Sequence, residues 1–175
     1  QQHTAAGEEV FVTGNPEHPE VIGIMGWAEG GISAIPDIET AEKLPNGEGR
    51  SVVLVSQTTF NIDKFKLIID ILNKKHYYVN AINTICNATF ERQSEAKELA
   101  KQSDAMIVIG GRSSSNTKKL FEICKDQCRN TQLIQTVGDL NFVQDEAVQN
   151  VGITAGASTP KEIIEEVQNY VRDEF

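Results

Sequence analysis

Small and hydroxyl-bearing residues gather in four short loops of this chain. Each loop follows a predicted strand and precedes a predicted helix, so the helix offers unpaired backbone N–H groups and the positive end of its dipole. The hydroxyls add further donors, and His18 and Arg112 are the only basic side chains in these loops. The pattern predicts a phosphate or diphosphate held mainly by neutral hydrogen-bond donors. The four loops are residues 14–20, 56–59, 110–116 and 155–158.

A simpler interpretation of any one loop is a helix cap, because Ser, Thr and Asn are preferred at helix N-termini. Four such loops in one chain favour binding, since ligands of open parallel sheets lie outside the carboxyl ends of the strands. We therefore expect a phosphate-binding α/β protein.

Cys86 follows a predicted strand and stands at the start of a predicted helix. A helix N-terminus favours the thiolate, which is both a nucleophile and a metal ligand. A buried small hydrophobic residue is an equal alternative. Cys124 and Cys128 lie four apart on a predicted helix; we expect them to pack in the core, because zinc and cluster sites need about four ligands. Three cysteines without a secretory signal favour a reducing cytoplasm.

His18 and Glu20 form the other reactive pair. A histidine and a carboxylate beside an anion site could move protons. The alternative is a solvated turn that opens a helix, with Glu20 favoured by the helix dipole.

These residues must be positioned by alternating strands and helices. Apolar runs rich in Val and Ile, mostly without alternation, are typical of buried parallel strands. Helical spacing places apolar residues on one face of segments 65–72, 89–101 and 120–124. The last helix should have Thr159 as its N-cap, Pro160 in its first turn and an inward apolar face. The expected strands are 9–13, 32–35, 51–55, 77–82, 105–109, 132–137 and 151–154. The inward face consists of Ile163, Ile164, Val167 and Val171.

Strand–helix alternation predicts an α/β fold with parallel sheets covered by helices. The strands could form one doubly wound sheet or two smaller ones, and the expected break lies near residues 83–86. We place one α/β unit at 1–83 and a second at 84–175.

Composition limits the function classes. The chain has 175 residues with 16 basic and 25 acidic ones, giving a net charge of −9. Scattered Lys and Arg on an acidic protein argue against nucleic-acid binding. No apolar run reaches the roughly 20 residues of a membrane span. The start lacks a methionine, so we expect that it lies inside a larger reading frame or results from processing or cloning.

The loops also carry a specific resemblance. The chain resembles the LytB/IspH family of 4-hydroxy-3-methylbut-2-enyl diphosphate reductases in five motifs, which occur in the family's order and span most of the sequence. Residues 14–23 resemble its G-x-x-x-HPEV-x-G segment, 56–59 its QTT loop, 84–93 its T/D-I-C-x-AT-x-x-RQ motif, 114–117 its SSN loop and 151–160 its VG-I/V-TAGAS-x-P run.

The resemblance implies a reaction of non-mevalonate isoprenoid synthesis. The family removes the 4-hydroxyl of (E)-4-hydroxy-3-methylbut-2-enyl diphosphate reductively, giving isopentenyl and dimethylallyl diphosphate. It uses a [4Fe-4S] cluster and electrons from a ferredoxin or flavodoxin. Its fold has three similar α/β units around a central cavity, and this chain would supply the second and third. The loops and Cys86 would then gather around that cavity.

Site residues follow from the motifs that match. The resemblance implies that Cys86 is a cluster ligand, that Glu20 serves the proton relay and that Thr58 lies near the leaving hydroxyl. The remaining matches would bind substrate: His18, Thr58, Thr59, Ser114, Ser115, Asn116 and Ser158.

One departure from the family limits this expectation. The family uses three cysteine ligands, and two of them belong to an N-terminal portion that has no match here. We therefore expect this polypeptide alone to be inactive as a reductase. The alternatives are a diphosphate-binding module without redox chemistry and a thiol enzyme with Cys86 as nucleophile.

Overall fold

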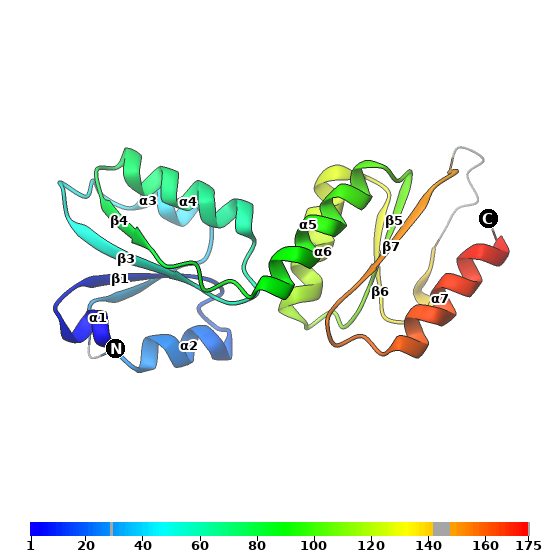
Figure 1. The fold of residues 1–175 in the computed structure, drawn as a ribbon, viewed down its shortest axis with the longest axis horizontal. Helices are drawn as coiled ribbons and strands as arrows, with labels where there is room; N and C mark the ends of the chain where they lie inside the picture. The colour runs from blue at the N-terminus through cyan, green and yellow to red at the C-terminus, as the bar shows by residue number, and fades with distance from the viewer. Residues whose placement is uncertain (29, 142–147, 175) are drawn as a thin grey trace. The chain divides into compact units, whose positions relative to one another are not determined.

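The computed structural model describes residues 1–28, 30–141 and 148–174 (Figure 1). It divides into two compact units, Gln1–Cys86 and Asn87–Phe175. This division falls between Cys86 and Asn87, next to the predicted break near residues 83–86, whereas the predicted unit boundary lay between residues 83 and 84. Cys86 is therefore the last residue of the first unit.

The first unit is built on a four-stranded sheet with the strand order β2-β1-β3-β4. All neighbouring strands are parallel, with Val12 opposite both Ala34 and Val55. The elements are α1 (Gln2–Ala5), β1 (Glu9–Thr13), α2 (Pro19–Gly26), β2 (Ile32–Ile35), α3 (Ile38–Lys43), β3 (Ser51–Ser56), α4 (Ile62–Lys74) and β4 (Tyr78–Ala81).

Helices cover both faces of this sheet, with α3 and α4 on one side and α2 on the other (Figure 1). The alternation along β1 explains the two layers. Phe11 packs into a cluster with Phe65 and Ile68 of α4. Its neighbour Val12 packs with Val21 of α2 on the opposite face.

The second unit has a three-stranded parallel sheet with the order β6-β5-β7. The central strand β5 is buried along its whole length, so it forms the middle of the core. Its residues Met106 and Val108 face α5 and α6, while Ile107 and Ile109 face α7. The elements are α5 (Asn87–Lys101), β5 (Ala105–Ile109), α6 (Ser115–Gln127), β6 (Thr131–Ile134), the 3-10 helix η1 (Val137–Asp139), β7 (Val151–Ala155) and α7 (Lys161–Glu174).

The predicted α/β class with parallel sheets is confirmed, and the elements differ in detail. The predicted strand 132–137 ends at Ile134, because the Asp139 carboxylate accepts the backbone N–H groups of Gln135 and Thr136 and turns the chain into η1. The predicted cap Thr159 instead donates its hydroxyl to the Ile109 carbonyl at 3.0 Å. The inward face of α7 is as expected, with Val167 and Val171 buried and Ile163 and Ile164 packed against them.

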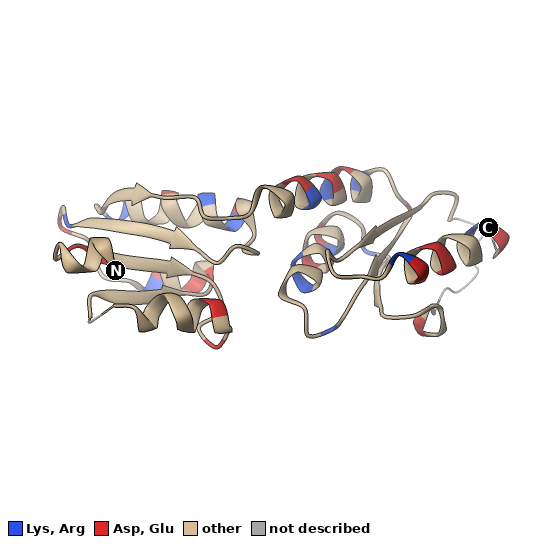
Figure 2. Ribbon diagram, turned by 60° about the horizontal axis from the view of Figure 1, so that its bottom comes forward, with Lys and Arg blue, Asp and Glu red and all other residues tan. Residues whose placement is uncertain are grey.

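The charged side chains are distributed over the helices with both signs interspersed (Figure 2). Pairs of opposite charge occur within single helices, such as Lys43 with Glu39, Lys101 with Glu98 and Lys161 with Glu165. Among the described residues, no helix combines the length and apolar character that crossing a bilayer requires.

Candidate functional site

Glu20 and Thr58 meet in the first unit at the carboxyl ends of β1 and β3. Glu20 stands in the first turn of α2, and Thr58 lies in the loop after β3. The Glu20 carboxylate accepts the Thr58 backbone N–H at 2.8 Å through Oε1 and the Thr58 hydroxyl at 3.0 Å through Oε2. The loop–helix junctions thus bring together a carboxyl group and a hydroxyl, the groups a proton relay needs.

His18 is the N-cap of α2. Its Nδ1 accepts the backbone N–H of Glu20 at 3.2 Å, and Pro19 fills the first helical position. An accepting Nδ1 carries no proton, so in the neutral ring the proton is on Nε2. His18 therefore presents an N–H donor on the side of the ring away from the helix backbone.

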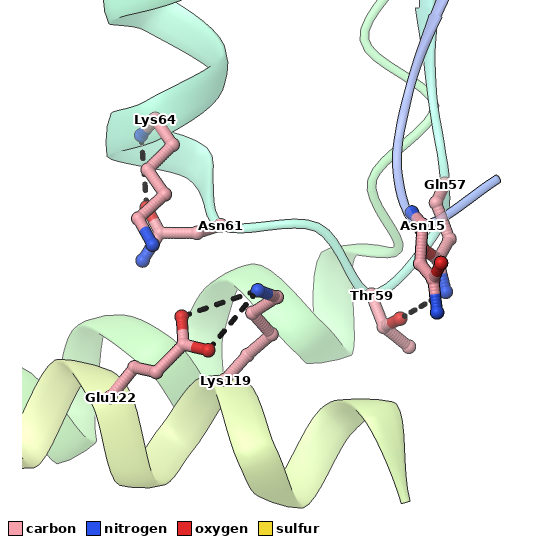
Figure 3. A network of polar contacts seen from close by, with 7 residues as sticks. All are labelled: Asn15, Gln57, Thr59, Asn61, Lys64, Lys119 and Glu122. Atoms are coloured by element: carbon pink, nitrogen blue, oxygen red, sulfur yellow. Dashed lines mark hydrogen bonds and ion pairs between the residues drawn. The ribbon is translucent and has the colours of Figure 1, made fainter. Parts of the chain in front are cut away.

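Gln57 joins the loop of residues 14–20, here called the HPE loop, to the QTT loop of residues 56–59 (Figure 3). Its Oε1 accepts the Asn15 backbone N–H at 3.3 Å, and its Nε2 donates to the Thr59 hydroxyl at 3.1 Å. The side chain is buried and lies close to Gly14, where a Cβ would come within 2.8 Å of the Gln57 Cβ. Sequence reasoning missed Gln57 as a structural link, although it is the first letter of the QTT motif.

Cys86 is tied to the same loop. Its backbone N–H donates to the Thr58 carbonyl at 3.0 Å, and its thiol is exposed. The preceding residue Ile85 is 5% exposed and packs in the core of the first unit. Thr58 therefore contacts Glu20 through its hydroxyl and backbone N–H, and Cys86 through the Cys86 backbone N–H, so these three residues are linked within one unit.

The SSN loop opens α6 in the second unit. Ser114 is the N-cap, and its hydroxyl accepts the backbone N–H of Thr117 at 3.3 Å. Ser114 and Ser115 are half-buried, whereas Ser158, in the loop after β7, is exposed. These serines lie at the carboxyl end of the second sheet, beside the helix N-terminus that was predicted to bind an anion.

Asn116 is the unusual residue of this loop. It is 8% exposed, and neither its Nδ2 nor its Oδ1 has a hydrogen-bond partner among the described residues. Buried side-chain amides are nearly always paired, because an unpaired group loses its hydration without compensation. An unpaired amide at a helix N-terminus is therefore a group that a ligand would satisfy.

Thr117 holds the two loops of the second unit together. It is 1% exposed and lies between the loops after β5 and β7. A Cβ on Gly110 would lie 2.6 Å from the Thr117 Oγ1, and one on Gly156 would lie 2.3 Å from it. The two glycines thus allow a close approach that no other residue type permits, and Thr117 was missed by sequence reasoning.

The one basic side chain in the polar loops of the second unit, Arg112, lies near an aspartate. Arg112 is exposed and lies 3.8 Å from the Asp139 carboxylate. The backbone N–H groups of Gln135 and Thr136 hold the pKa of Asp139 below its usual value. Arg112 thus faces an ionised carboxylate.

Cys124 and Cys128 are buried against α5, and burial raises the pKa of the Cys124 thiol to about 12. The prediction that these two cysteines pack in the core is confirmed. Among the described residues, no group of three His, Cys, Asp or Glu side chains could hold a metal ion. Cys86 is therefore a single candidate ligand, and the described residues by themselves do not fit a [4Fe-4S] cluster.

A cavity of about 780 Å³ in the first unit lies away from these groups. Its lining includes Glu9, Trp27 and Arg50. Glu9 is the first residue of β1, whereas the HPE loop follows Thr13 at the other end of the strand. The candidate residues of the first unit therefore lie at the carboxyl ends of the strands, at the opposite end of β1 from this cavity.

The candidate residues fall into two sets, one in each unit. His18, Glu20, Thr58, Thr59 and Cys86 belong to the first unit, whereas Ser114, Ser115, Asn116 and Ser158 belong to the second. The expectation that both sets gather around one cavity stays a prediction.

Comparison with known proteins identifies the family. The LytB protein family model matches residues 1–172. The chain is 42% identical over 173 residues to the 4-hydroxy-3-methylbut-2-enyl diphosphate reductase of Geobacter metallireducens, covering 99% of this chain and 61% of that protein. It is 44% identical over 167 residues to the reductase of the same name from Clostridioides difficile, covering 95% of this chain and 60% of that protein.

A solved structure of a reductase supports the same family. The E-1-hydroxy-2-methyl-but-2-enyl-4-diphosphate reductase from Plasmodium falciparum superposes with a TM-score of 0.85 at 29% identity, covering 98% of this chain and 54% of that chain. The chain therefore spans about three fifths of the length of the curated relatives it matches. With a family model that matches almost every residue and with the same fold, this chain belongs to the LytB protein family.

Proposed function

We propose that this chain supplies the diphosphate-binding and proton-delivering parts of a 4-hydroxy-3-methylbut-2-enyl diphosphate reductase. The names of its relatives support the substrate, and the arrangement of its loops supports the division of labour. In the proposed reaction the C4–O bond of the allylic alcohol breaks and the hydroxyl leaves as water. A pair of electrons and a pair of protons are consumed, one proton by the leaving hydroxyl and the other by the allylic carbon skeleton.

Glu20 and Thr58 are the proposed proton-delivering pair, and their contact is the observation that carries the proposal. The Thr58 hydroxyl donates to the Glu20 carboxylate at 3.0 Å, and this bond would reverse once Glu20 is protonated. A proton could then pass from Glu20 to the Thr58 oxygen while Thr58 releases its own proton to the leaving hydroxyl. The second bond, from the Thr58 N–H to Glu20, fixes the carboxylate plane. A reaction that must form water needs such an oriented donor.

The loops of the second unit are the proposed diphosphate donors. Ser114, Ser115 and Ser158 offer hydroxyls, and the start of α6 adds backbone N–H groups and a positive dipole end. The unpaired amide of Asn116 supports this assignment, because a phosphate oxygen would accept from its Nδ2. His18 would add the donor of its Nε2, and Thr59 a hydroxyl, in the first unit.

The cluster chemistry needs more than this chain. When bound, a [4Fe-4S] cluster would supply the electron pair, which it would receive from a ferredoxin or flavodoxin. Cys86 would hold it at one position, and the other thiolates would have to come from outside these 175 residues. The chain alone is therefore expected to lack reductase activity, and a cytoplasmic location stays part of the proposal.

A second candidate function follows from the presence of one candidate cluster ligand together with several anion donors. The chain has neutral anion donors in one unit and one exposed cysteine in the other, so it could act as a diphosphate-binding module without redox chemistry. A nucleophilic role for Cys86 would need a base beside its sulfur, whereas the hydrogen bond that Cys86 makes to another described residue comes from its backbone N–H.

Calorimetric titration tests the proposed binding. The chain should bind (E)-4-hydroxy-3-methylbut-2-enyl diphosphate but not the alcohol that lacks the diphosphate. Asn116→Ala should weaken binding at least tenfold, an effect of the size expected for a hydrogen bond to a charged group. The matched control is Asn150→Ala, because Asn150 stands before β7 at the opposite end of the sheet. Equal binding of alcohol and diphosphate, or equal loss in both variants, would refute the proposal.

A separate measurement distinguishes reductase from binding module. After anaerobic treatment with iron and sulfide, the chain alone should show no stable cluster absorbance and no substrate reduction by a chemical reductant. Cluster absorbance with turnover would show that the chain suffices, and would overturn the expectation of an inactive part.

A further inference from the structure

We propose that Thr84 is a positioning residue whose hydroxyl extends the pairing of β3 beyond the end of β4 and thereby fixes Cys86 beside Thr58. The inference rests on the proposed role of Cys86 and adds the device that places it. Four backbone and side-chain contacts at the end of the first sheet carry it.

The regular ladder between β3 and β4 ends just before this segment. Leu54 is opposite Ala81, the last residue of β4, and the Ile82 N–H donates to the Leu54 carbonyl at 2.8 Å. One step further along β3, the next residue to be paired is Ser56. Ser56 is 1% exposed, so its backbone N–H and carbonyl both need partners.

Thr84 supplies both partners with one hydroxyl. The Ser56 N–H donates to the Thr84 Oγ1 at 2.8 Å, and the Thr84 hydroxyl donates to the Ser56 carbonyl. In a parallel ladder these bonds would come from two backbone groups of the neighbouring strand. A hydroxyl can replace both because it is a donor and an acceptor at once.

Backbone pairing resumes after this bridge. The Cys86 N–H donates to the Thr58 carbonyl at 3.0 Å. Ser56 and Thr84 are 28 residues apart, and the Ile82–Leu54 and Cys86–Thr58 bonds have the same offset. The segment after β4 therefore follows β3 in constant register as far as Cys86.

Two further contacts hold the segment between these bonds. Ile85 is buried in the core of the first unit, and its N–H donates to the Asn83 Oδ1 at 3.0 Å. Because Thr58 also binds Glu20, the Thr84 bridge sets the position of the thiol-bearing residue relative to the proposed acid. Thr84 does not touch the reacting atoms; it acts through the backbone of Cys86.

Amide hydrogen exchange measured by NMR tests the bridge without any ligand. In the unaltered chain, the amides of Ser56 and Cys86 should exchange slowly, as those of β3 do. Thr84→Val keeps the shape of the side chain and removes the hydroxyl, so both amides should exchange roughly tenfold faster or more. Thr84→Ser keeps the hydroxyl and should restore the protection to within about twofold.

A matched control separates positioning from general stability. Thr13 is buried, whereas Thr84 is exposed, and its hydroxyl likewise donates to Ser56, in this case to the side chain at 2.8 Å, from its place on β1. Thr13→Val should leave the Cys86 amide protected after correction for the change in global stability. If Thr84→Val does not fold, Thr84→Ala removes the same hydroxyl without placing a methyl against Ser56.

Several outcomes would overturn the inference. They are an unprotected Cys86 amide in the unaltered chain, unchanged protection in Thr84→Val, or equal loss in Thr84→Val and Thr13→Val. Because exchange requires neither diphosphate nor cluster, these failures are distinct from a failure of the proposed function, which would appear as absent diphosphate binding.

Discussion

The two units have the same arrangement of sheet and helices, but their loops carry different functional groups. Each has a parallel sheet with helices on both faces, and each carries its polar loops at the carboxyl ends of the strands. The first unit carries an imidazole, a carboxylate and a thiol, on His18, Glu20 and Cys86. The second presents neutral donors at the start of α6, with an unpaired amide among them.

The way the loops are held also differs. In the first unit, side chains such as Gln57 bond to groups of neighbouring loops, so hydrogen bonds set the positions. In the second unit, Gly110 and Gly156 let Thr117 fit between two loops and the Thr159 hydroxyl bonds to the Ile109 carbonyl, so close packing adds to hydrogen bonding in setting the positions. We infer that the acid–base groups are oriented chiefly by directional bonds, whereas the anion donors depend in addition on two backbone turns brought close together.

The largest effect should come from adding a side chain at Gly156, where the backbone contacts Thr117 in the second unit. In Gly156→Ala the new Cβ would lie 2.3 Å from the Thr117 Oγ1, so the loop after β7 must move. We expect a loss of about 3 kcal/mol in the free energy of unfolding, measured by urea denaturation, together with loss of diphosphate binding. In the control Gly111→Ala the new Cβ would have no atom within 4 Å. Equal stability of the two variants would contradict the packing account.

The next largest effect concerns the acid of the first unit. Glu20→Gln keeps the size of the side chain and removes its acidic proton. In a preparation that shows reductase turnover, the rate should fall by roughly 100-fold or more, as for other general acids. Diphosphate affinity of the chain should change by less than about threefold, because the variant keeps every donor of the second unit. A large fall in affinity with unchanged turnover would reverse the assigned roles of the units.

A smaller effect is expected from the cap of α6. Ser114→Ala removes the acceptor of the Thr117 N–H, which should cost about 1 kcal/mol of unfolding free energy. It should also weaken diphosphate binding, since a proposed donor is lost. Ser113→Ala, one residue earlier at an exposed position, is the matched control and should change neither quantity. Thermal unfolding and calorimetry would show whether the two variants differ.

The smallest effect is a pH dependence of the second unit. Backbone N–H groups lower the pKa of Asp104 and Asp139, so each carboxylate stabilises the folded state above the ordinary pKa of 3.8. This contribution is lost as the pH falls through and below 3.8, because the folded state must then take up protons against its hydrogen bonds. Asp139→Asn should reduce the acid sensitivity of the urea midpoint. An unchanged pH profile would show that these bonds do not influence folding.

Much of the fold could be predicted from local sequence. The bounds of β1, β2 and β5 agree with the predicted strands because apolar Val and Ile runs are bounded by polar loops. The end of β6 was predicted too late, because the Asp139 side chain competes for backbone N–H groups within a few residues.

The contacts that assemble the site were beyond local reasoning. The Thr159 hydroxyl bonds a carbonyl 50 residues away, and the Glu20–Thr58 bond spans 38 residues. Helix starts and loop composition indicated that these residues lie at strand ends. They could not indicate which side chains meet, because that depends on strand order and on the glycine positions that allow loops to touch.

The most direct test of the division of labour is a titration of isotope-labelled chain with (E)-4-hydroxy-3-methylbut-2-enyl diphosphate, followed by amide NMR shifts. We predict that the amides of 114–117 and 155–158 shift with the diphosphate ester, and that they stay unchanged with the alcohol alone. Shifts confined to the first unit, or equal shifts with the alcohol, would contradict the assignment of the diphosphate to the neutral donors of the second unit.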